Sequence, residues 1–324
     1  MNPSIAVITP TYNRVGSLGR AIESVLAQAH GDFEYFVVDD GSTDGSEDLV
    51  RGYGDARIRY VKQPQRQGAN AARNRGLELA TAPVVTFLDS DDFFLPHRLA
   101  HSLRRFEDHP QLQLLLSSFE LAAGDGKERG QPLPNRDRWL SADQLEELLL
   151  WHAFFLAGSS ITVRREVLRA AGGGACRLQR IQDRELLLNL VRHQRTAWLR
   201  GNGGERWAWL VEEVDWCKVT SADSLSAAPT GSILALGEVL ACHPELLQRH
   251  GLGVRYLVAA AIANRLGRGD LQAAAGTYGE NLAVPSFRFD PFSLLLAYGK
   301  GSAVYGRLFR AATSLEGAVL PPPL

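Results

Sequence analysis

Cysteine is scarce in this chain, and long apolar runs are missing. Only three of the 324 residues are cysteines, Cys176, Cys217 and Cys242, and they stand far apart. They form neither a CxxC pair nor a metal-ligand spacing, which predicts buried thiols in a reducing compartment. No apolar stretch reaches the roughly 20 residues of a transmembrane helix. The first residues resemble no signal peptide, so we expect a cytoplasmic protein.

An excess of charge of either sign is also missing. The chain has 35 basic and 36 acidic residues and a net charge of −1 at pH 7. No overall field would therefore recruit nucleic acid or an anionic membrane. The eight histidines show no metal-ligand pattern in the sequence, and His97, His101 and His109 are expected on a helix surface.

Short apolar runs and amphipathic segments alternate over residues 1–92. Apolar runs that predict strands lie at 5–9, 33–38, 58–61 and 84–88. Helical periodicity lies between them, at about 17–26, 43–53 and 69–79. Ser42 or Thr43 is expected to cap the second helix. This alternation predicts an α/β fold with a mostly parallel sheet and flanking helices.

Polar residues follow three of these strands, at 10–13, 39–42 and 89–92. Ligands of parallel sheets bind beyond the carboxyl ends of the strands, so the three segments should meet in one crevice. The last contains Asp89, Asp91 and Asp92, whose mutual repulsion a divalent cation with a phosphorylated ligand would relieve. Oxygen ligands suit Mg²⁺ or Mn²⁺. The alternative is a polar turn in which Asp92 caps the next helix.

The pattern is less regular beyond residue 92. Helices are expected at 97–107, 142–155, 165–171 and 183–192, and strands at 112–116, 159–163 and 207–211. A long polar loop is expected at 122–138 and a flexible turn at 172–174. From about residue 228 strand signals vanish, and packed helices followed by a loose proline-rich tail are expected.

Four blocks of the N-terminal part resemble the family 2 glycosyltransferases of the GT-A fold. They are residues 7–14, 37–44, 68–76 and 87–92, in the order of that family. The resemblance is weaker from 93 to 226 and absent after about 228. It implies a nucleotide-sugar-binding half (1–110), an acceptor-binding and catalytic half (111–227) and a C-terminal α-helical region (228–324). It also implies transfer of a sugar from a nucleotide diphosphate sugar, with a UDP-sugar favoured.

The same resemblance implies a set of donor-binding residues. In chain order they are Thr9, Pro10, Tyr12, Asp39, Asp40, Asn70, Arg73, Asp89 and Asp91. Asp91 and Asp92 would hold the Mn²⁺ or Mg²⁺ ion. Each assignment has a structural alternative: core packing for Tyr12, a capping turn for the acids after the second strand, and a solvated helix surface for Asn70 and Arg73.

The transfer also needs a general base that takes the proton of the acceptor hydroxyl. In the family the base stands before an apolar helix and after a glycine-rich turn, and residues 181–190 resemble that block. Asp183 is therefore the expected base and Glu185 the reserve, while Gln182 stands where the family often has an acid. The alternative is that Asp183 only caps the helix. Direct displacement with one base implies inversion at the anomeric carbon.

Two further segments are compared with the family. Residues 217–226 resemble the segment that folds over the diphosphate, with Lys218, Ser224 and Ser226 in place but Thr220 where the family has a histidine. The QxxRW signature of processive members is absent, which predicts that one sugar is added per encounter.

Other functions stay open at this point. A nucleotidyltransferase would also use acids at a parallel sheet, and a degenerate member would only bind nucleotide sugars. The acceptor could be a sugar, a lipid-linked sugar or a protein. The C-terminal helices could cover the acceptor site, form a homodimer, or place residues 292–298 on a membrane surface as a peripheral contact.

Overall fold

The computed structural model describes most of the chain up to Thr220 and a few later residues. These are residues 3–123, 128–133, 137–151, 157–174, 178, 182–199, 206–220, 239, 242, 243, 245 and 246. The chain divides into two compact units, Met1–Glu146 with Phe154–Ala228, and Glu147–Ala153 with Pro229–Leu324. The first unit carries nearly all described residues and is the subject below. The expected helices beyond residue 228 lie almost wholly outside the described residues.

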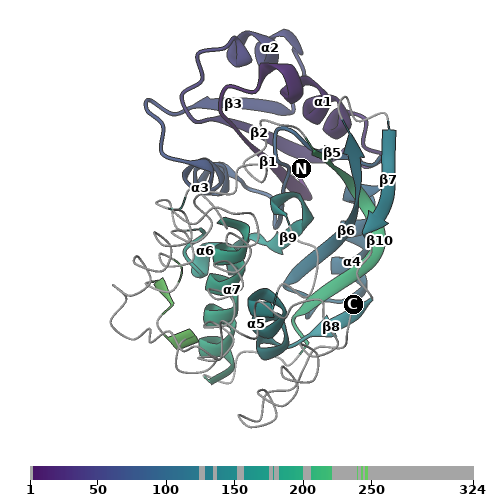
Figure 1. Ribbon diagram of the computed structural model, residues 1–324, viewed down its shortest axis with the longest axis vertical. Coiled ribbons are helices and arrows are strands. Elements are labelled where there is room, and N and C mark those ends of the chain that lie inside the picture. The colour runs from purple at the N-terminus through teal and green to yellow at the C-terminus, as the bar shows by residue number, and fades with distance from the viewer. Residues whose placement is uncertain are drawn as a thin grey trace, which may run out of the picture. The chain divides into compact units, whose positions relative to one another are not determined.

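Ten described strands form one sheet in the order β3-β2-β1-β4-β9-β6-β10-β5, with β7 paired to β6 and β8 to β10 (Figure 1). The strands are β1 (Ile5–Thr11), β2 (Phe33–Asp39), β3 (Ile58–Lys62), β4 (Val84–Phe87), β5 (Phe93–Phe94), β6 (Leu114–Ala123), β7 (Glu128–Leu133), β8 (Arg138–Leu140), β9 (Ile161–Arg164) and β10 (Ala208–Thr220). The expected α/β fold is confirmed. The sheet is parallel from β3 to β4 and mixed beyond, where β9 runs antiparallel to both its neighbours.

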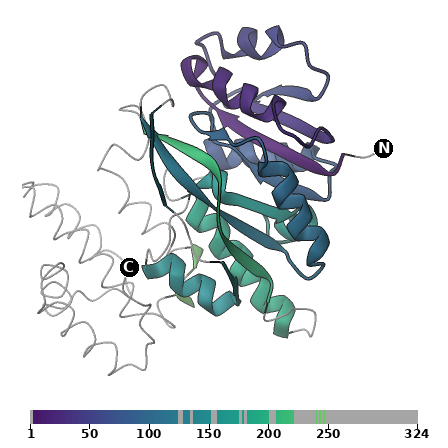
Figure 2. The ribbon, with the colours of Figure 1, turned by 90° about the vertical axis from the view of Figure 1, so that its right-hand side faces the viewer.

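Seven α-helices and one 3₁₀ turn connect the described strands. They are α1 (Val15–Leu26), α2 (Ser46–Gly52), α3 (Ala69–Leu79), α4 (Arg98–Asp108), α5 (Ala142–Trp151), η1 (Gly158–Ser160), α6 (Arg165–Ala170) and α7 (Gln182–Leu199). Right-handed crossovers place α1 and α2 on one face of the parallel half and α3 on the other, as Figure 1 shows. Long strands β6 and β10 run side by side in parallel (Figure 2).

The core of the parallel half follows directly from the apolar periodicity. Leu18, Ala21, Ile22 and Val25 of α1 are buried, and β1, β2 and β4 are buried along their whole length. Strands with both faces covered are expected to be apolar throughout. This rigid base holds the polar residues that follow the strands.

Helix α2 begins later than the sequence predicts, so the expected N-cap is wrong. Gly45 precedes Ser46 with a φ of 84° and no side-chain cap. The Ser42 hydroxyl instead accepts a hydrogen bond from the Asn13 amide (2.8 Å), and the Thr43 amide donates to Asn13 Oδ1 (2.9 Å). The residues expected to cap a helix therefore join the loops after β1 and β2.

Three element predictions in the second half are also corrected. The expected loop at 122–138 contains β7, which pairs with β6. Strand β10 continues to Thr220 with irregular register near Val214. The charged residues at 212, 213 and 215 interrupt its apolar pattern, which is why the sequence predicts only 207–211. Helix α7 continues to Leu199, beyond the predicted end at 192. The apolar pattern on which the prediction rests weakens in its more polar C-terminal half. In the described part of the chain, no helix is long and apolar enough to cross a membrane.

Candidate active site

The carboxyl ends of β2, β1 and β4 lie next to one another in the sheet. Hydrogen bonds join the segments that follow them. The Asp40 amide donates to the Thr11 carbonyl (2.9 Å), and Arg20 of α1 donates to the Asp91 carbonyl (2.9 Å). The three polar segments of the sequence therefore share one edge of the sheet, as the strand-end pattern predicts.

The two acids after β2 are buried and hold the surrounding loops. Asp39 accepts hydrogen bonds from the Ser42 amide (2.7 Å) and from the Tyr60 hydroxyl. Asp40 accepts from the Gln67 and Gly68 amides, both at 2.7 Å, in the loop before α3. Both acids thus shape this end of the sheet, and the capping alternative describes part of what they do.

The first-strand residues line the same end. The hydroxyl of buried Thr9 lies 3.0 Å from that of Tyr35, and Pro10 is buried beside it. Tyr12 is half-buried, and the guanidinium of Arg66 lies 4.2 Å from the centre of its ring. Tyr12 is therefore not a core residue, because one face of its ring meets an exposed cation.

Helix α3 turns Asn70 and Arg73 inward, so the solvated-surface alternative for this pair is wrong. Asn70 is fully buried and Arg73 is 5% exposed. Arg73 forms an ion pair with Asp89 (2.6 Å) and donates to Asn70 Oδ1 (3.1 Å) and Gln182 Oε1 (3.3 Å). One guanidinium thus connects α3, the loop after β4 and the start of α7.

The 3₁₀ turn η1 positions the acids after β4. The Ser159 hydroxyl accepts from the Asp89 amide (3.0 Å) and donates to Asp92 Oδ2 (2.8 Å). The Val219 amide of β10 donates to Asp92 Oδ1 (3.1 Å). Gly158 leaves the room for this approach, since a Cβ there would lie 2.8 Å from an Arg73 nitrogen and 2.9 Å from Asp89 Oδ1. Asp92 does not cap α4, which begins after His97 without a side-chain cap.

Carboxylates crowd together here, and burial adds to their mutual repulsion. Burial and then the charge of Asp89 raise the pKa of Asp91. Burial raises the pKa of Asp92 to about 8, against the opposing effect of Lys218. Burial alone would lower the pKa of the Lys218 ammonium, but it is raised by four nearby carboxylates, those of Asp92, Asp89, Asp91 and Asp183. The charges of all four acids therefore act on one lysine.

A divalent cation fits this group of oxygen donors. Crowded buried carboxylates with raised pKa values are stabilised by positive charge, and oxygen ligands suit Mn²⁺ and Mg²⁺. The Asp92 oxygens both accept hydrogen bonds from the protein. Among described residues, the Asp91 carboxylate has no hydrogen-bonded partner other than its own backbone.

Hydrogen bonds join the glycine turn at 172–174 to α3 and to α7. The Asn74 amide side chain donates to the Gly174 carbonyl (2.9 Å) and accepts from the Gly174 amide (3.1 Å). A Cβ on Gly173 would lie 2.2 Å from Asn74 Oδ1. Glycine is needed at 173 because the Asn74 side chain lies against its backbone and because its φ is positive (68°).

Helix α7 begins at this junction and presents the expected base. Asp183 lies half-buried in its first turn, where the helix dipole favours a carboxylate. Glu185 is buried and accepts a hydrogen bond from Asn189 (2.6 Å), which also donates to the Gly173 carbonyl. The reserve candidate thus helps to hold the glycine turn.

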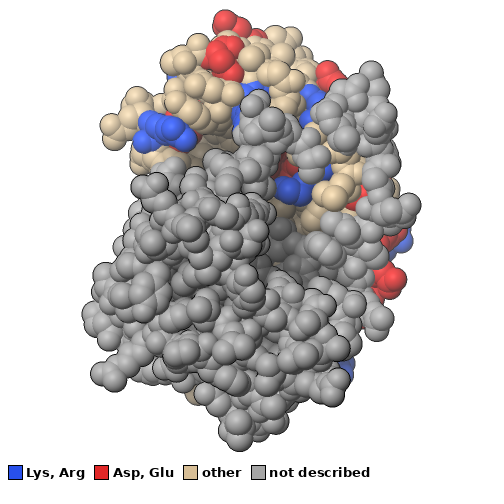
Figure 3. All heavy atoms as spheres, viewed as in Figure 1, with Lys and Arg blue, Asp and Glu red and all other residues tan. Residues whose placement is uncertain are grey.

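Several residues of the site carry no signal that the sequence alone reveals. Ser159 is predicted only as the start of a strand, and Gly158 carries no prediction, yet both position the acids after β4. Gln182 reads as a departure from the family, yet it accepts a hydrogen bond from Arg73. Ser224 and Ser226 lie outside the described residues. On the face seen in Figure 3, acidic and basic side chains of the described residues are interspersed.

Comparison with known proteins agrees with this geometry. A family model described as Glycosyl transferase family 2 matches residues 6–172, a little over half of the chain. The GalNAc(5)-diNAcBac-PP-undecaprenol beta-1,3-glucosyltransferase of Campylobacter jejuni is 39% identical over 106 residues, which are 32% of this chain and 34% of that protein. Across three other curated relatives, the matched stretch covers 17% to 50% of the relative's own length.

Solved structures show the same fold. The structure of S. aureus TarS 1-349 in complex with UDP-GlcNAc has a TM-score of 0.60 and 18% identity, over 92% of this chain and 80% of that one. The mannosyltransferase PcManGT from Pyrobaculum calidifontis, in complex with GDP-Man and Mn²⁺, has a TM-score of 0.55 and 20% identity, over 98% and 85%. The expected GT-A fold is confirmed. Together with the matched family model, these findings show that the chain belongs to glycosyl transferase family 2.

Proposed function

We propose that the protein transfers one sugar from a nucleotide diphosphate sugar to an acceptor hydroxyl, with inversion at the anomeric carbon. A UDP-sugar is the favoured donor. The observation that carries this proposal is the set of hydrogen bonds that joins the loop after β4 to the start of α7. Arg73 binds both Asp89 and Gln182, the residue before Asp183. The proposed binding and acid–base groups would therefore act together beyond the carboxyl ends of the strands, where ligands of such folds bind.

The donor would bind across the ends of β1 and β2 and the start of α3. Thr9, Pro10 and Tyr12 would contact base and ribose, and Tyr12 offers a flat ring to a base. A base that stacks on the face now covered by Arg66 would displace that side chain. Asp39 and Asp40 are proposed to lie at the edge of the donor's nucleobase. A buried carboxylate there would distinguish one nucleobase from another by accepting hydrogen bonds from its N–H groups.

Arg73 and Asn70 are proposed to set the position of Asp89 relative to the donor. Arg73 also binds Gln182, the residue before Asp183. It would therefore fix the position of the loop that carries Asp89 relative to the proposed general base Asp183. A guanidinium with several fixed acceptors is well suited to this role, since its planar fork loses little freedom when bonded.

Asp91 is proposed to hold the cation directly, with Asp92, buried and bonded on both oxygens, as the more distant of the two expected ligands. A bound Mn²⁺ or Mg²⁺ would stabilise the negative charge of the departing diphosphate. Lys218, already among the acids, would add positive charge on the same side.

Asp183 is proposed as the general base. The positive end of the helix dipole favours a carboxylate in the first turn, and a carboxylate is a suitable group to take the proton of the acceptor hydroxyl. The relative from Campylobacter jejuni is named as acting on a lipid-linked sugar, so we propose a glycan-type acceptor. The transfer is proposed to take place in the cytoplasm. A peripheral membrane contact or homodimer through residues 228–324 belongs to the same proposal.

Release of nucleoside diphosphate from UDP-, GDP- and dTDP-sugars with Mn²⁺ tests the proposal. We expect one donor class to be turned over and to raise the Tm. Asp183→Asn should keep that Tm rise and lose transfer. Asp48→Asn, on the exposed face of α2, is the matched control and should keep both. Pyrophosphate release, or transfer by Asp183→Asn near the wild-type rate, would contradict it.

A further inference from the structure

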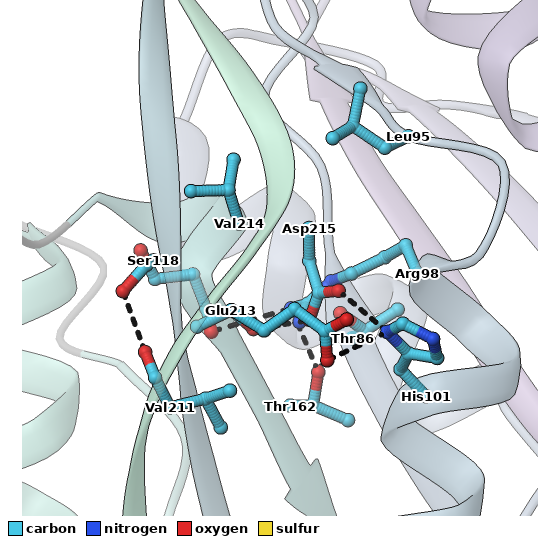
Figure 4. A network of polar contacts seen from close by, with 12 residues as sticks. Thr86, Leu95, Arg98, His101, Ser118, Thr162, Val211, Glu213, Val214 and Asp215 are labelled. Atoms are coloured by element: carbon cyan, nitrogen blue, oxygen red, sulfur yellow. Dashed lines mark hydrogen bonds and ion pairs between the residues drawn. The ribbon is translucent and has the colours of Figure 1, made fainter. Parts of the chain in front are cut away.

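A cluster of side chains of metal-ligating types lies between α4 and β10. His97 and His101 stand one turn apart at the start of α4, and residues four apart on a helix share a face. Glu213 and Asp215 stand two apart on β10, and alternate residues of a strand share a face. Figure 4 shows Glu213 and Asp215 on the side of β10 that faces His101, with Val214 on the other side.

The distances within this cluster suit a small cation. His101 Nδ1 lies 3.2 Å from Glu213 Oε2 and 3.2 Å from Asp215 Oδ1. His97 Nε2 lies 3.5 Å from Asp215 Oδ1. A tetrahedral ion with bonds of about 2.0–2.1 Å holds neighbouring ligand atoms about 3.3 Å apart. One ligand atom from each of His97, His101 and Glu213 lies within 4.8 Å of the others.

We propose that His97, His101 and Glu213, with Asp215 as the fourth ligand, bind a divalent transition-metal ion of the zinc class. Two imidazole nitrogens with carboxylate oxygens favour Zn²⁺, Co²⁺ or Ni²⁺ over Mg²⁺. The acids near Lys218 offer oxygen alone, so the two sites differ in the ions that they prefer.

The residues behind the cluster hold it in place. Asp215 is 2% exposed, and its second oxygen lies 3.2 Å from Arg98 Nη1. Arg98 is fully buried and also donates to Ser117, to Thr162 Oγ1 (3.0 Å) and to two backbone carbonyls. Ligating carboxylates are commonly oriented by such outer contacts. The side chains of His97 and Glu213 are 39% and 51% exposed, so an ion can reach the site from solvent.

Ion binding competes with contacts inside the cluster. His97 Nε2 lies 3.2 Å from the Val214 carbonyl, and it must lose its proton before it can ligate a metal. The competing explanation is therefore a network of hydrogen bonds and ion pairs that needs no metal. Either way the cluster joins α4 to β10, the strand that carries Lys218 and Val219 toward the acids.

Titration of the metal-free full chain with Co²⁺ tests the proposal, because tetrahedral Co²⁺ absorbs visible light far more strongly than octahedral Co²⁺. We expect about one tightly bound ion per chain with a tetrahedral spectrum, displaced by Zn²⁺. His101→Gln should abolish the spectrum. Glu213→Gln, at an exposed position that tolerates change, should weaken Co²⁺ affinity at least about tenfold.

Two controls separate this site from others. His193→Gln, on the half-buried surface of α7, and Asp91→Asn, at the acid-only site, should both keep the Co²⁺ spectrum unchanged. Far-UV circular dichroism checks that each variant is folded. Absence of a tetrahedral spectrum in the wild type, its loss in Asp91→Asn, or its persistence in folded Glu213→Gln with unchanged affinity would overturn the proposal.

Discussion

Replacing Gly158 with alanine tests whether close approach of η1 holds the active site together. The added Cβ would lie 2.8 Å from Arg73 Nη2 and 2.9 and 3.0 Å from the two oxygens of Asp89. Contacts this short force a shift. Neither partner can move without losing hydrogen bonds. Arg73 is 5% exposed and donates to three acceptors, and the Asp89 amide donates to Ser159.

The expected cost follows from overpacking of a buried position. Such insertions destabilise by about 1–3 kcal/mol, which lowers the Tm by roughly 2–12 °C for a unit of this size. The Arg73–Asp89 pair would separate, so donor affinity should fall as well. A loss of about 1.4 kcal/mol in transition-state binding lowers kcat/KM tenfold.

Gly16→Ala is the matched control, since a Cβ there meets nothing within 4 Å. It lies in the first turn of α1 and should raise stability slightly, because alanine favours the helix by about 0.5–1 kcal/mol over glycine. Urea unfolding, donor-dependent Tm shifts and kcat/KM are to be measured for both variants. If Gly158→Ala matches Gly16→Ala in stability and donor affinity, the proposed packing role of η1 is refuted.

Three further predictions concern the acids, the glycine turn and the product. The pKa of Asp92 is about 8 in the native protein and about 3.9 in the unfolded chain. Between these pH values the native protein holds a proton that the unfolded chain has lost, so stability falls as pH rises across this window. Urea unfolding in EDTA at pH 5 and 8 should show a smaller fall in stability for Asp92→Asn than for the wild type, and an equal fall would contradict the assignment. Gly173→Ala should destabilise more than Gly172→Ala, since both have positive φ but only Gly173 faces Asn74 without room for a Cβ; equal melting temperatures would exclude the docking role. An α-linked donor should give a β-linked product by NMR, and retained configuration would rule out a single displacement.

The parallel half of the fold could be predicted from sequence because its signals are local. Apolar runs at 5–9 and 33–38 match β1 and β2, and helix α3 has the predicted bounds at 69–79. A strand buried on both faces and a helix with one buried face each impose a period that the sequence displays. The second half was less predictable, since β10 carries Glu212, Glu213 and Asp215 within its length and its register is irregular there.

The sequence also indicated which kinds of residue form the candidate site. It did not indicate which residues they contact. The blocks with Asp39, Asp89 and Asp183 indicated nucleotide-sugar chemistry. Arg73 reaches Gln182 across 109 positions because the start of α7 lies against α3. Ser159 reaches Asp92 across 67 positions because β9, which follows η1, pairs with β4. Such contacts leave no periodic trace in the sequence.

The sequence by itself thus determined the α/β class, the ordered family blocks and the acids, because strand, helix and turn preferences act over a few residues. Tertiary structure alone decided which groups bind Asp92, that Asn70 and Arg73 point inward, why glycine stands at 158 and 173, and that His97 and His101 meet Glu213 and Asp215. Each of these depends on the packing of elements that are distant in the chain, where burial and charge are set by neighbours that local pattern cannot identify.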